Sequence, residues 1–227
     1  MQAADKTQSI KDEIKKGLGE SCDISVKTCE TVKGVCVYAY EDALINKETL
    51  FRDILPYLKS DGFDGDIHNF VACDCKSTKD IDSLCQGVLG GCLGLYFDEK
   101  YYLFSIQSWE KRSVTIPEAE NVIRGPKEGF TEDLQTNISL IRRKIKNKNL
   151  ILEKHIIGRQ SNTSLCICYM NGIADPEIVK GITDKITAID VDGVFDVGQI
   201  EQLIEEKPMH SVAGMGMTQK PDVCAMR

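Results

Sequence analysis

A stretch in the middle of the chain, residues 113–149, constrains the fold most, because it predicts two helices with a forced break between them. The first helix is expected to begin near Pro117, since proline at the first helical position loses only an N–H that has no partner there. The turn 124–129 must end this helix, because Pro126 disfavours the helical region at Gly125 and glycine loosens the backbone. The break therefore separates two elements of the fold.

The second helix is expected to begin at Thr131, a good N-cap residue. Its apolar residues fall within roughly 60° of arc at 100° per residue and are Leu134, Ile138, Ile141 and Ile145. Its last turns carry four basic residues that suit the negative end of the helix dipole, namely Arg142, Arg143, Lys144 and Lys146. The pattern predicts an amphipathic helix with one core-facing stripe and a solvated basic face.

Charge and hydropathy exclude several classes of protein. The chain has 28 Lys and Arg against 35 Asp and Glu, a net charge of −7, and its only basic cluster lacks interleaved aromatic residues, so a nucleic-acid partner is not predicted. Residues 1–20 are too polar for a signal peptide. The longest apolar run, 88–97, is about half of the ~18–20 residues that a membrane-spanning helix needs, so any membrane anchor would lie outside these residues.

Ten cysteines raise the question of metal or disulfides. No pair has the Cys-x2-Cys spacing that is typical of zinc sites, and the close pairs are Cys73/Cys75 and Cys166/Cys168. Several cysteines lie in apolar runs, where a thiol serves as a small buried side chain. Free thiols in a reducing or anaerobic cytoplasm are favoured over metal ligands or disulfides, and no cofactor or metal is predicted.

Strand and helix signals alternate along the first half of the chain. Residues 1–20 form a polar lead-in with one short helix, which places Ile10, Ile14 and Leu18 on one side. Strands are predicted at 24–28, 34–40 and 67–73, and helices at 47–58 and 78–88, the latter capped by Ser77 or Thr78. A β-hairpin follows, with strands 92–97 and 101–107 and a turn at 98–100.

The second half of the chain shows fewer signals. A connector with strand character is predicted at 149–157, a buried strand at 164–169, a helix from Asp175-Pro176 to 186, a short strand or bridge at 187–191, a helix at 197–206 and a loop from 207 onwards. Residues 35–48 and 164–177 share a strand, a turn and a helix start, with Tyr40 over Tyr169, Asn46 over Asp175 and Glu48 over Glu177. This repeat predicts an α/β fold of two small subdomains, 21–112 and 113–227, each a β-sheet flanked by helices.

The order of residues around the central break carries a resemblance to a known family. The segments Pro-Glu-x-Glu (117–120), Val-Ile-Arg-Gly-Pro-Lys-Glu-Gly-Phe (122–130) and Thr-Asn-Ile-x-Leu-Ile-Arg-Arg (136–143) resemble the signature of the A subunits of bacterial spore germination receptors, the GerA family. The likeness extends to the hairpin, to the segment 158–175 and to Thr-Gln-Lys-Pro-Asp at 218–222, which is similar to a motif just ahead of the family's first membrane helices. The motif positions in this sequence are Pro117, Glu118, Gly125, Pro126, Gly129, Phe130, Gly158, Arg159, Asp175, Pro221 and Asp222.

The chain departs from the family pattern in three places. The Asp-Gly hairpin turn is Asp98-Glu99 here, a Pro-Phe-Pro segment is Pro208-Met209-His210, and Gln219-Lys220 replaces Glu-Arg. These departures concern the geometry of the hairpin and of the last residues. They leave the central signature intact.

The resemblance implies a role without chemistry. Such a domain would sense a germinant, or couple its binding to a membrane assembly that triggers spore germination. Its partners would be the B and C subunits, other A subunits in a homo-oligomer, and a small germinant such as an amino acid, sugar or nucleoside. It would sit at the inner spore membrane through a membrane domain outside this chain, on the cytoplasmic (spore core) side, and the loop after 207 would lead to that membrane domain.

Four residues of the central stretch are candidates for ligand binding or for coupling of the subdomains: Arg124, Glu128, Asn137 and Arg142. Arginine can take a carboxylate or phosphate through two hydrogen bonds, while Asn and Glu can orient an ammonium or hydroxyl group. The alternative is that Arg124 pairs with Glu118, Glu128 or Glu132 and fixes the subdomain junction.

Two other functions stay open. A structural module for subunit assembly would need no ligand, and would use strand edges and the basic helix face. A thiol-dependent enzyme would need a cysteine beside a base, and only His68 lies close in sequence to Cys73 and Cys75. Neither His-Glu-x-x-His nor Gly-x-Ser-x-Gly occurs.

Overall fold

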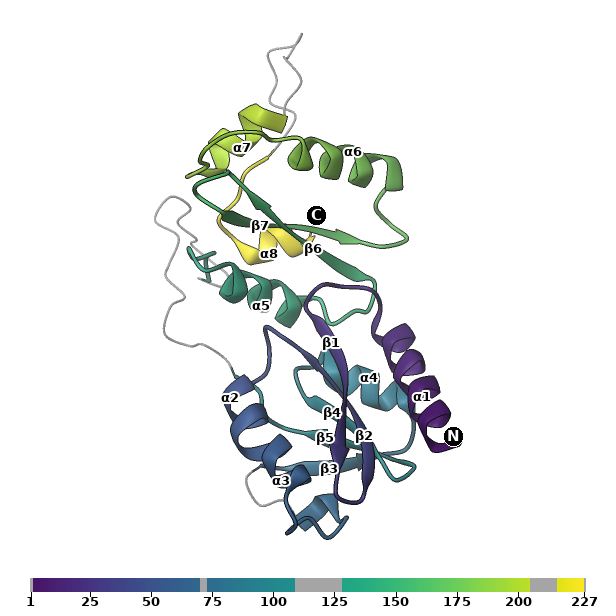
Figure 1. The fold of residues 1–227 in the computed structure, drawn as a ribbon. Coiled ribbons are helices and arrows are strands. Elements are labelled where there is room, and N and C mark those ends of the chain that lie inside the picture. The colour runs from purple at the N-terminus through teal and green to yellow at the C-terminus, as the bar shows by residue number, and fades with distance from the viewer. Residues whose placement is uncertain (1, 70–72, 109–127, 205–215, 227) are drawn as a thin grey trace. The chain divides into compact units, whose positions relative to one another are not determined.

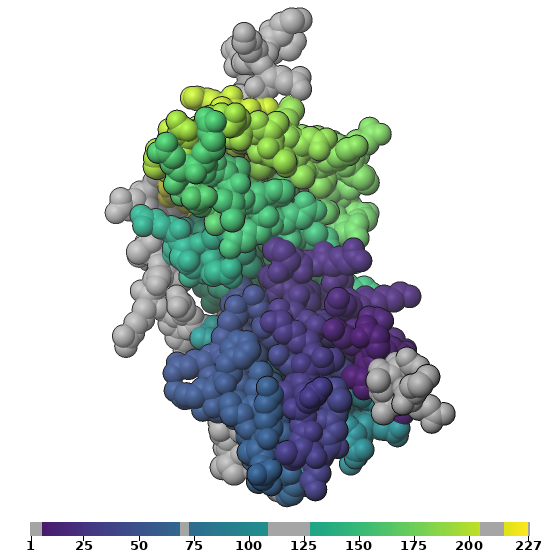
Figure 2. Space-filling model, in the orientation of Figure 1, coloured from purple at the N-terminus to yellow at the C-terminus, as the bar shows by residue number. Residues whose placement is uncertain are grey.

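The computed structural model describes residues 2–69, 73–108, 128–204 and 216–226, and Figures 1 and 2 colour the described parts of the chain by residue number. The chain divides into two compact units. Unit 1 comprises Met1–Arg112 and Arg142–Lys148, and unit 2 comprises Ser113–Ile141 and Asn149–Arg227. Residues Arg142–Lys148 thus group with unit 1, although they follow unit 2 residues in sequence.

The described residues of unit 1 form a five-stranded sheet in the order β1-β2-β4-β5-β3 (Figure 1). Every neighbouring pair is antiparallel. The strands are β1 (Ile24–Thr31), β2 (Gly34–Glu41), β3 (Cys75–Thr78), β4 (Leu93–Phe97) and β5 (Lys100–Phe104). Together with the sheet of unit 2 and the flanking helices, this confirms the predicted α/β class.

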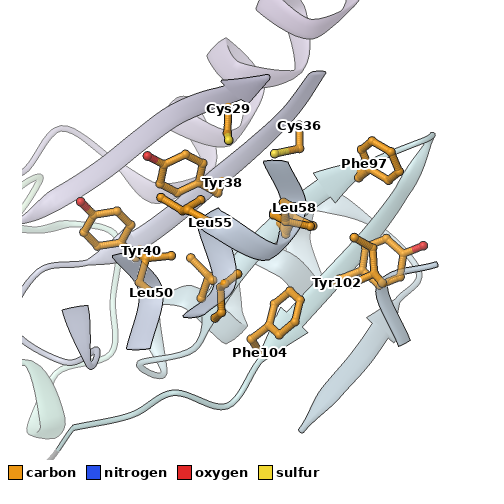
Figure 3. Packing of buried hydrophobic residues seen from close by; sticks show 14 of the residues in the cluster. Cys29, Cys36, Tyr38, Tyr40, Leu50, Leu55, Leu58, Phe97, Tyr102 and Phe104 are labelled. Atoms are coloured by element: carbon orange, nitrogen blue, oxygen red, sulfur yellow. The ribbon is translucent and has the colours of Figure 1, made fainter. Parts of the chain in front are cut away.

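Strand β2 is buried on both faces of the sheet, which explains its unbroken apolar sequence. On one face Cys36, Tyr38 and Tyr40 join a cluster with Leu50, Ile54, Leu55 and Leu58 (Figure 3). On the other face Val37 and Ala39 pack with Ile14, Leu18, Leu84 and Val88. Because side chains alternate along a strand, the two sets must serve separate layers of core.

Helices cover both faces of this sheet. Helices α1 (Gln2–Leu18) and α4 (Ile81–Leu89) cover one face, and the segment 47–59 covers the other. This segment is one run of helix made of α2 (Lys47–Thr49), a π-helical stretch (Leu50–Ile54) and α3 (Leu55–Lys59), as predicted at 47–58. The Leu55 N–H donates to Leu50 O, and Pro56 next to it has no N–H, which fits a local widening of the helix.

Three predictions for unit 1 change. The predicted short helix in the polar lead-in is the 17-residue α1, and its Ile14 and Leu18 are fully buried in the core. The strand predicted at 67–73 is wrong for its described part, because Ile67–Asn69 forms a 3-10 turn. The side chains of Asp64 and Asp66 accept N–H bonds at 2.8 Å and 2.9 Å two residues further on, and such local bonds compete with strand pairing.

The next helix also begins later than predicted. Residues 75–78, which include the predicted caps Ser77 and Thr78, form strand β3. The N-cap of α4 is Asp80, whose carboxylate accepts the Ser83 N–H at 2.8 Å. The hairpin β4–β5 is confirmed, with Asp98 and Glu99 in its turn at φ 48° and 61°.

In unit 2 the described residues form a two-stranded antiparallel sheet of β6 (Leu150–Ile157) and β7 (Thr163–Met170). The helices are α5 (Leu134–Lys144, whose last three residues belong to unit 1), α6 (Pro176–Thr187), α7 (Val197–Ile204) and α8 (Pro221–Met226). A core forms around Ile157, Ile186 and Val194, with Leu165, Ile167 and Ile200 packed against it. The helices in the two repeated segments, 35–48 and 164–177, begin at equivalent positions, since Asn46 caps α2 and Asp175 caps α6.

Other predictions for unit 2 need correction. Strand β7 is only partly buried, because the described sheet has two strands and leaves most of its side chains at intermediate exposure. No strand forms at 187–191; instead the carbonyls of Val191 and Asp192 accept backbone N–H bonds from residues 159–161. The loop predicted from 207 onwards contains α8, which begins at a proline. The helix predicted near Pro117 lies outside the described residues.

Candidate functional site

Helix α5 begins two residues later than predicted, with its N-cap at Asp133 and not at Thr131. The carboxylate of Asp133 accepts the Thr136 N–H at 2.6 Å and so caps the helix, a role that had been expected of Thr131. Thr131 is bound instead to the candidate residue Asn137. The Asn137 side chain accepts the Thr131 N–H at 2.7 Å and donates to the Thr131 carbonyl at 2.7 Å. Asn137 therefore holds the residues that lead into the helix.

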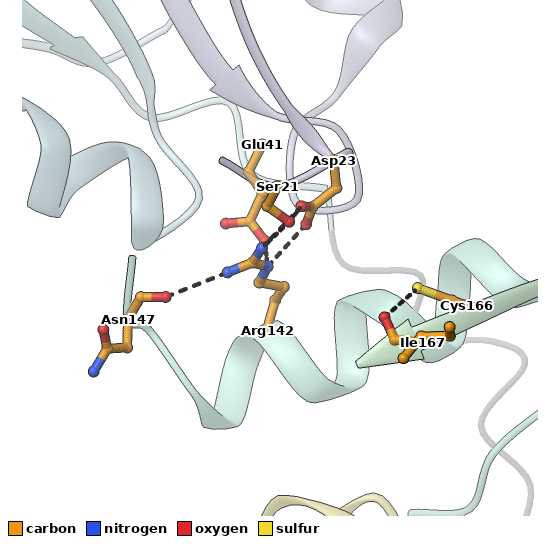
Figure 4. Close-up of polar contacts among 7 residues, drawn as sticks. All are labelled: Ser21, Asp23, Glu41, Arg142, Asn147, Cys166 and Ile167. Carbon is orange, nitrogen blue, oxygen red and sulfur yellow. Dashed lines mark hydrogen bonds and ion pairs between the residues drawn. The ribbon is translucent and has the colours of Figure 1, made fainter. Parts of the chain in front are cut away.

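Arg142 is fully buried, so the prediction of a solvated basic face is wrong for this residue. Its Nε donates to Asp23 Oδ2 and its Nη2 to Asp23 Oδ1, both at 2.8 Å (Figure 4). Nη2 also donates to Ser21 Oγ at 2.8 Å, and Nη1 reaches the Asn147 carbonyl at 3.4 Å. Two parallel bonds to one carboxylate are the strongest pairing that arginine makes in proteins.

The loop between α1 and β1 presents the partners of Arg142. Ser21 Oγ donates to Asp23 Oδ1 at 2.5 Å, which fixes the carboxylate, and Asp23 is 4% exposed. This loop starts at Gly19, which has φ 84° and ends α1 by donating its N–H to Lys15 O. A Cβ at Gly19 would lie 2.3 Å from the carbonyl oxygen of Lys148, so glycine lets the loop approach the segment that follows Arg142.

Glu41, at the end of β2, completes what we call the Arg142 cluster: Ser21, Asp23, Glu41 and Arg142. Its side chain is 0% exposed, and Oε1 lies 2.9 Å from Arg142 Nε. That N–H is directed at Asp23, and neither carboxyl oxygen of Glu41 has a hydrogen-bond partner within the described chain. Burial raises the pKa of Glu41 to about 9, with Arg142 lowering it and the neighbouring Asp23 raising it further.

The Arg142 cluster is an internal ion pair in unit 1. The two parallel hydrogen bonds that Arg142 could make to a ligand carboxylate are made to Asp23. The other candidate residues lie elsewhere: Glu128 is half-buried, and Arg124 lies outside the described residues, together with Pro117, Glu118, Gly125 and Pro126. Within the described chain, the Asn137 side chain bonds to Thr131 and the Arg142 side chain to Asp23.

Several motif positions have a structural role in unit 2. The Phe130 N–H donates to Gln219 O at 2.8 Å, which links the central signature to the motif at 218–222. Gly129 and Pro221 are buried, and Asp222 lies in the first turn of α8. These contacts bring together two segments that are far apart in sequence.

Gly158 opens a tight turn with φ 82°. A Cβ there would lie 2.2 Å from Ser161 Oγ, and Ser161 in turn accepts the Val194 N–H at 3.2 Å. Arg159 is exposed and pairs with Asp192 at 3.1 Å and Asp190 at 3.4 Å. This turn joins β6 and β7 to the segment before α7.

The Cys/His neighbourhood does not form a nucleophilic pair. His68 Nε2 lies 2.8 Å from Ser77 Oγ, and its ring packs edge-on against Tyr102. Burial raises the pKa of Cys73 and of Cys75 to about 11, so both thiols are neutral at physiological pH, whereas a nucleophilic cysteine needs a lowered pKa.

The described residues contain neither a metal site nor a membrane span. No group of three or more His, Cys, Asp or Glu side chains in the described ranges is placed to hold a metal ion. In the same ranges, no helix combines the length and the apolarity that a membrane crossing requires.

Sequence reasoning singled out Arg142 but missed Ser21, Asp23 and Glu41. One signal was present. Glu41 directly follows an apolar run that is buried on both faces, and an acid at the end of such a strand needs a partner. Asp23 carries no comparable signal, because it lies in a polar segment between two elements.

Comparison with known proteins identifies the class. Residues 12–227 match the family model described as "Bacillus/Clostridium GerA spore germination protein". The chain therefore belongs to the GerA family of spore germination proteins, which confirms the resemblance seen in the sequence.

Individual relatives agree with this assignment. The chain is 32% identical over 226 residues to spore germination protein KA of Bacillus subtilis, covering 94% of this chain and 42% of the relative. It is 29% identical over 192 residues to spore germination protein GerQA of Bacillus cereus, covering 82% of this chain and 38% of that protein. The chain thus spans less than half the length of these relatives.

A solved structure has the same fold. The crystal structure of the N-terminal domain of the A subunit of the Bacillus megaterium spore germinant receptor GerK3 superposes with a TM-score of 0.65. The sequences are 24% identical, and the match covers 95% of this chain and 84% of that one. The fold of two sheets with flanking helices is therefore shared with a germinant receptor domain.

Proposed function

We propose that this chain couples the recognition of a nutrient germinant to a membrane assembly that triggers spore germination, and that it does so without catalysis. Family membership and the fold of a germinant receptor domain support the receptor context. The observation that supports coupling is the position of Arg142. Helix α5 contributes its residues up to Ile141 to unit 2, while Arg142 is bound in the interior of unit 1.

The partners in this proposal are the B and C subunits of a germination receptor and other A subunits. The domain would be held at the inner spore membrane by a membrane domain outside this chain, on the cytoplasmic side. The germinant would be an amino acid, a sugar or a nucleoside, bound here near Arg124 and Glu128 or by another subunit. The neutral, partly buried thiols of Cys73 and Cys75 favour this role over a thiol-dependent enzyme.

An NMR titration of this chain with amino acids, sugars and nucleosides tests direct sensing. Saturable shifts that are lost in Arg124→Ala, and kept in the control Arg159→Ala, would make the domain a sensor. The absence of shifts up to millimolar concentrations would assign germinant recognition to another subunit and leave coupling as the role of this one.

A germination assay tests coupling itself. Spores whose receptor carries Asp23→Asn should respond to nutrient more slowly than spores with Lys146→Gln, an exposed control, at equal receptor levels. An equal response of both would contradict a coupling role for the Arg142 cluster.

A specific observation favours a second candidate, a structural assembly module with no ligand. Large apolar side chains are exposed on unit 2, with Ile173 at 81%, Ile178 at 63% and Phe195 at 83%. Exposed apolar groups of this kind suit a protein partner. Under this alternative, Ile178→Glu should weaken co-purification with the other subunits, and an unchanged yield would remove it.

A further inference from the structure

Among the described residues, the interior of unit 1 holds two buried acids and one buried base. Asp23 and Glu41 are 4% and 0% exposed, and Arg142 is the cation between them. An unbalanced buried anion is strongly disfavoured, and a protein usually avoids it by keeping one acid protonated.

The hydrogen bonds indicate which acid carries the proton. Asp23 receives bonds from Arg142 Nε, Arg142 Nη2 and Ser21 Oγ, so it has the donors that a carboxylate requires. Glu41 receives none from the described residues. As a carboxylic acid, however, Glu41 has an O–H that can donate to the carboxylate of Asp23, and this bond would satisfy both groups.

Few charged groups face Glu41. Arg142 approaches it from α5 and Asp23 from the loop before β1, and these two are the charges that affect its pKa. The next acid along the chain, Asp42, pairs with Lys47 at 3.1 Å, and both of these side chains are partly exposed. No second cation in the described chain is bonded to Glu41.

We infer that Glu41 is a proton-dependent latch: its proton keeps Arg142–Lys148 docked in unit 1, and loss of that proton releases the segment. Once ionised, Glu41 and Asp23 would compete as two carboxylates for a single guanidinium in a site where all three groups are almost completely buried. The least costly response is to expose the cluster. The segment Arg142–Lys148 belongs to no strand of the unit 1 sheet, and its chain neighbours on both sides belong to unit 2, whereas Asp23 directly precedes β1 and Glu41 ends β2. This inference stands whether or not the domain takes part in germinant signalling.

A ¹³C NMR titration of the full chain, labelled at the glutamate carboxyl carbons, tests the proton directly. The Glu41 resonance, assigned through its absence in Glu41→Gln, should have the shift of a protonated acid at neutral pH and should titrate near 9. The exposed Glu30 on β1 provides the matched control, and its resonance is assigned through its absence in Glu30→Gln. Titration of Glu41 in the ordinary glutamate range would overturn the inference.

Trypsin cleavage after Lys146 and Lys148 tests the release. The cleavage rate of the unchanged protein is expressed relative to that of a free lysine peptide at the same pH. This relative rate should increase roughly tenfold when the pH rises by about one unit beyond the titration of Glu41. In Glu41→Gln, which keeps a neutral side chain, cleavage should stay slow across that range, while Glu30→Gln should behave like the unchanged protein. The same acceleration in Glu41→Gln, or none in either protein, would overturn the latch. If Glu41→Gln does not fold, the carbon titration, assigned by sequential NMR methods, still decides the inference.

Discussion

Arg142 is fully buried, so hydrogen bonds must compensate for the free energy that is needed to remove its guanidinium group from water. Two parallel hydrogen bonds to Asp23 and one to Ser21, each at 2.8 Å, use the rigid fork of the guanidinium group. Lysine could not reproduce this pattern, because its ammonium group is a single point. The arrangement therefore specifies both the residue type and its orientation.

Replacing Arg142 with alanine should destabilise the protein by roughly 3–5 kcal/mol, because it leaves Asp23 buried without its counter-charge. Urea unfolding followed by circular dichroism measures the loss. The control is Lys146→Ala, an exposed residue four positions further on, whose effect should stay within about 0.5 kcal/mol. A loss for Arg142→Ala as small as that of the control would contradict the burial of this arginine.

Glu41 should make stability depend on pH with a definite sign. Its pKa is about 9 in the folded protein against an ordinary value of 4.5, so between these values the folded state keeps a proton that the unfolded state has lost. Stability must therefore fall as pH rises through this window, by at most about 1.4 kcal/mol per pH unit. The urea midpoint of the unchanged protein should therefore fall relative to that of Glu41→Gln as pH increases. A constant difference between the two proteins would contradict the raised pKa.

The sequence could place Arg142 on a helix but could not show that it is buried. At 100° per residue it lies roughly 40° beyond the edge of the apolar stripe, close enough to the core to be buried if an acid meets it. That acid, Asp23, is 119 residues away in sequence. No local pattern connects two positions at that distance, so the ion pair follows only from the tertiary fold.

At the scale of elements, the hairpin β4–β5 offers a direct test. Asp98 and Glu99 both have positive φ, a conformation that costs most residues energy and costs glycine little. Glu99→Gly should therefore raise the melting temperature by roughly 2–4 °C. The variant also loses the exposed ion pair with Lys6, so Lys6→Gln is the control and should change the melting temperature little. A lower melting temperature for Glu99→Gly would show that this ion pair outweighs the backbone strain.

Two glycines of unit 2 separate backbone strain from steric contact. Gly158 and Gly172 have nearly equal φ, 82° and 83°, but a Cβ at Gly158 would meet Ser161 Oγ at 2.2 Å, while a Cβ at Gly172 would meet nothing within 4 Å. Gly172→Ala should cost roughly 1–2 kcal/mol from the left-handed backbone alone. Gly158→Ala should cost about 1–3 kcal/mol more, because the turn must also move. Equal losses in urea unfolding would contradict the close packing at Gly158.

The elements differ in how far the sequence could predict them. Strand β2 was predictable because cores on both of its faces demand an unbroken apolar run. Strand β7 has a similar sequence, SLCICY at 164–169, yet is only partly buried, since composition does not say how many layers cover a strand. The strand expected at 67–73 does not form at 67–69, the part that the structure describes, because the preceding aspartates bond to nearby N–H groups, which hydrophobicity does not register.

At the scale of the whole molecule, the two units have cores of different size. Unit 1 is built on two clusters that share a five-stranded sheet, whereas the described core of unit 2 centres on Ile157, Ile186 and Val194. A smaller core provides less burial to offset the entropy of ordering the chain. Unit 2 is therefore expected to open at a lower denaturant concentration than unit 1.

Hydrogen exchange measured by mass spectrometry at increasing denaturant can separate these two openings, and it also tests where Arg142 belongs. Amides of β2 and β4 report on unit 1, and those of β7 and α6 report on unit 2. Arg142→Ala should lower the protection of β2 and β4 and leave that of β7 and α6 nearly unchanged, because Asp23 and Glu41 lie in unit 1. Gly158→Ala should do the reverse, since its contacts are with Ser161 and the residues around Gly193. Equal loss of protection in both units of Arg142→Ala would show that the two units open as one cooperative body. The grouping of Arg142–Lys148 with unit 1 would then not correspond to a separate unfolding unit.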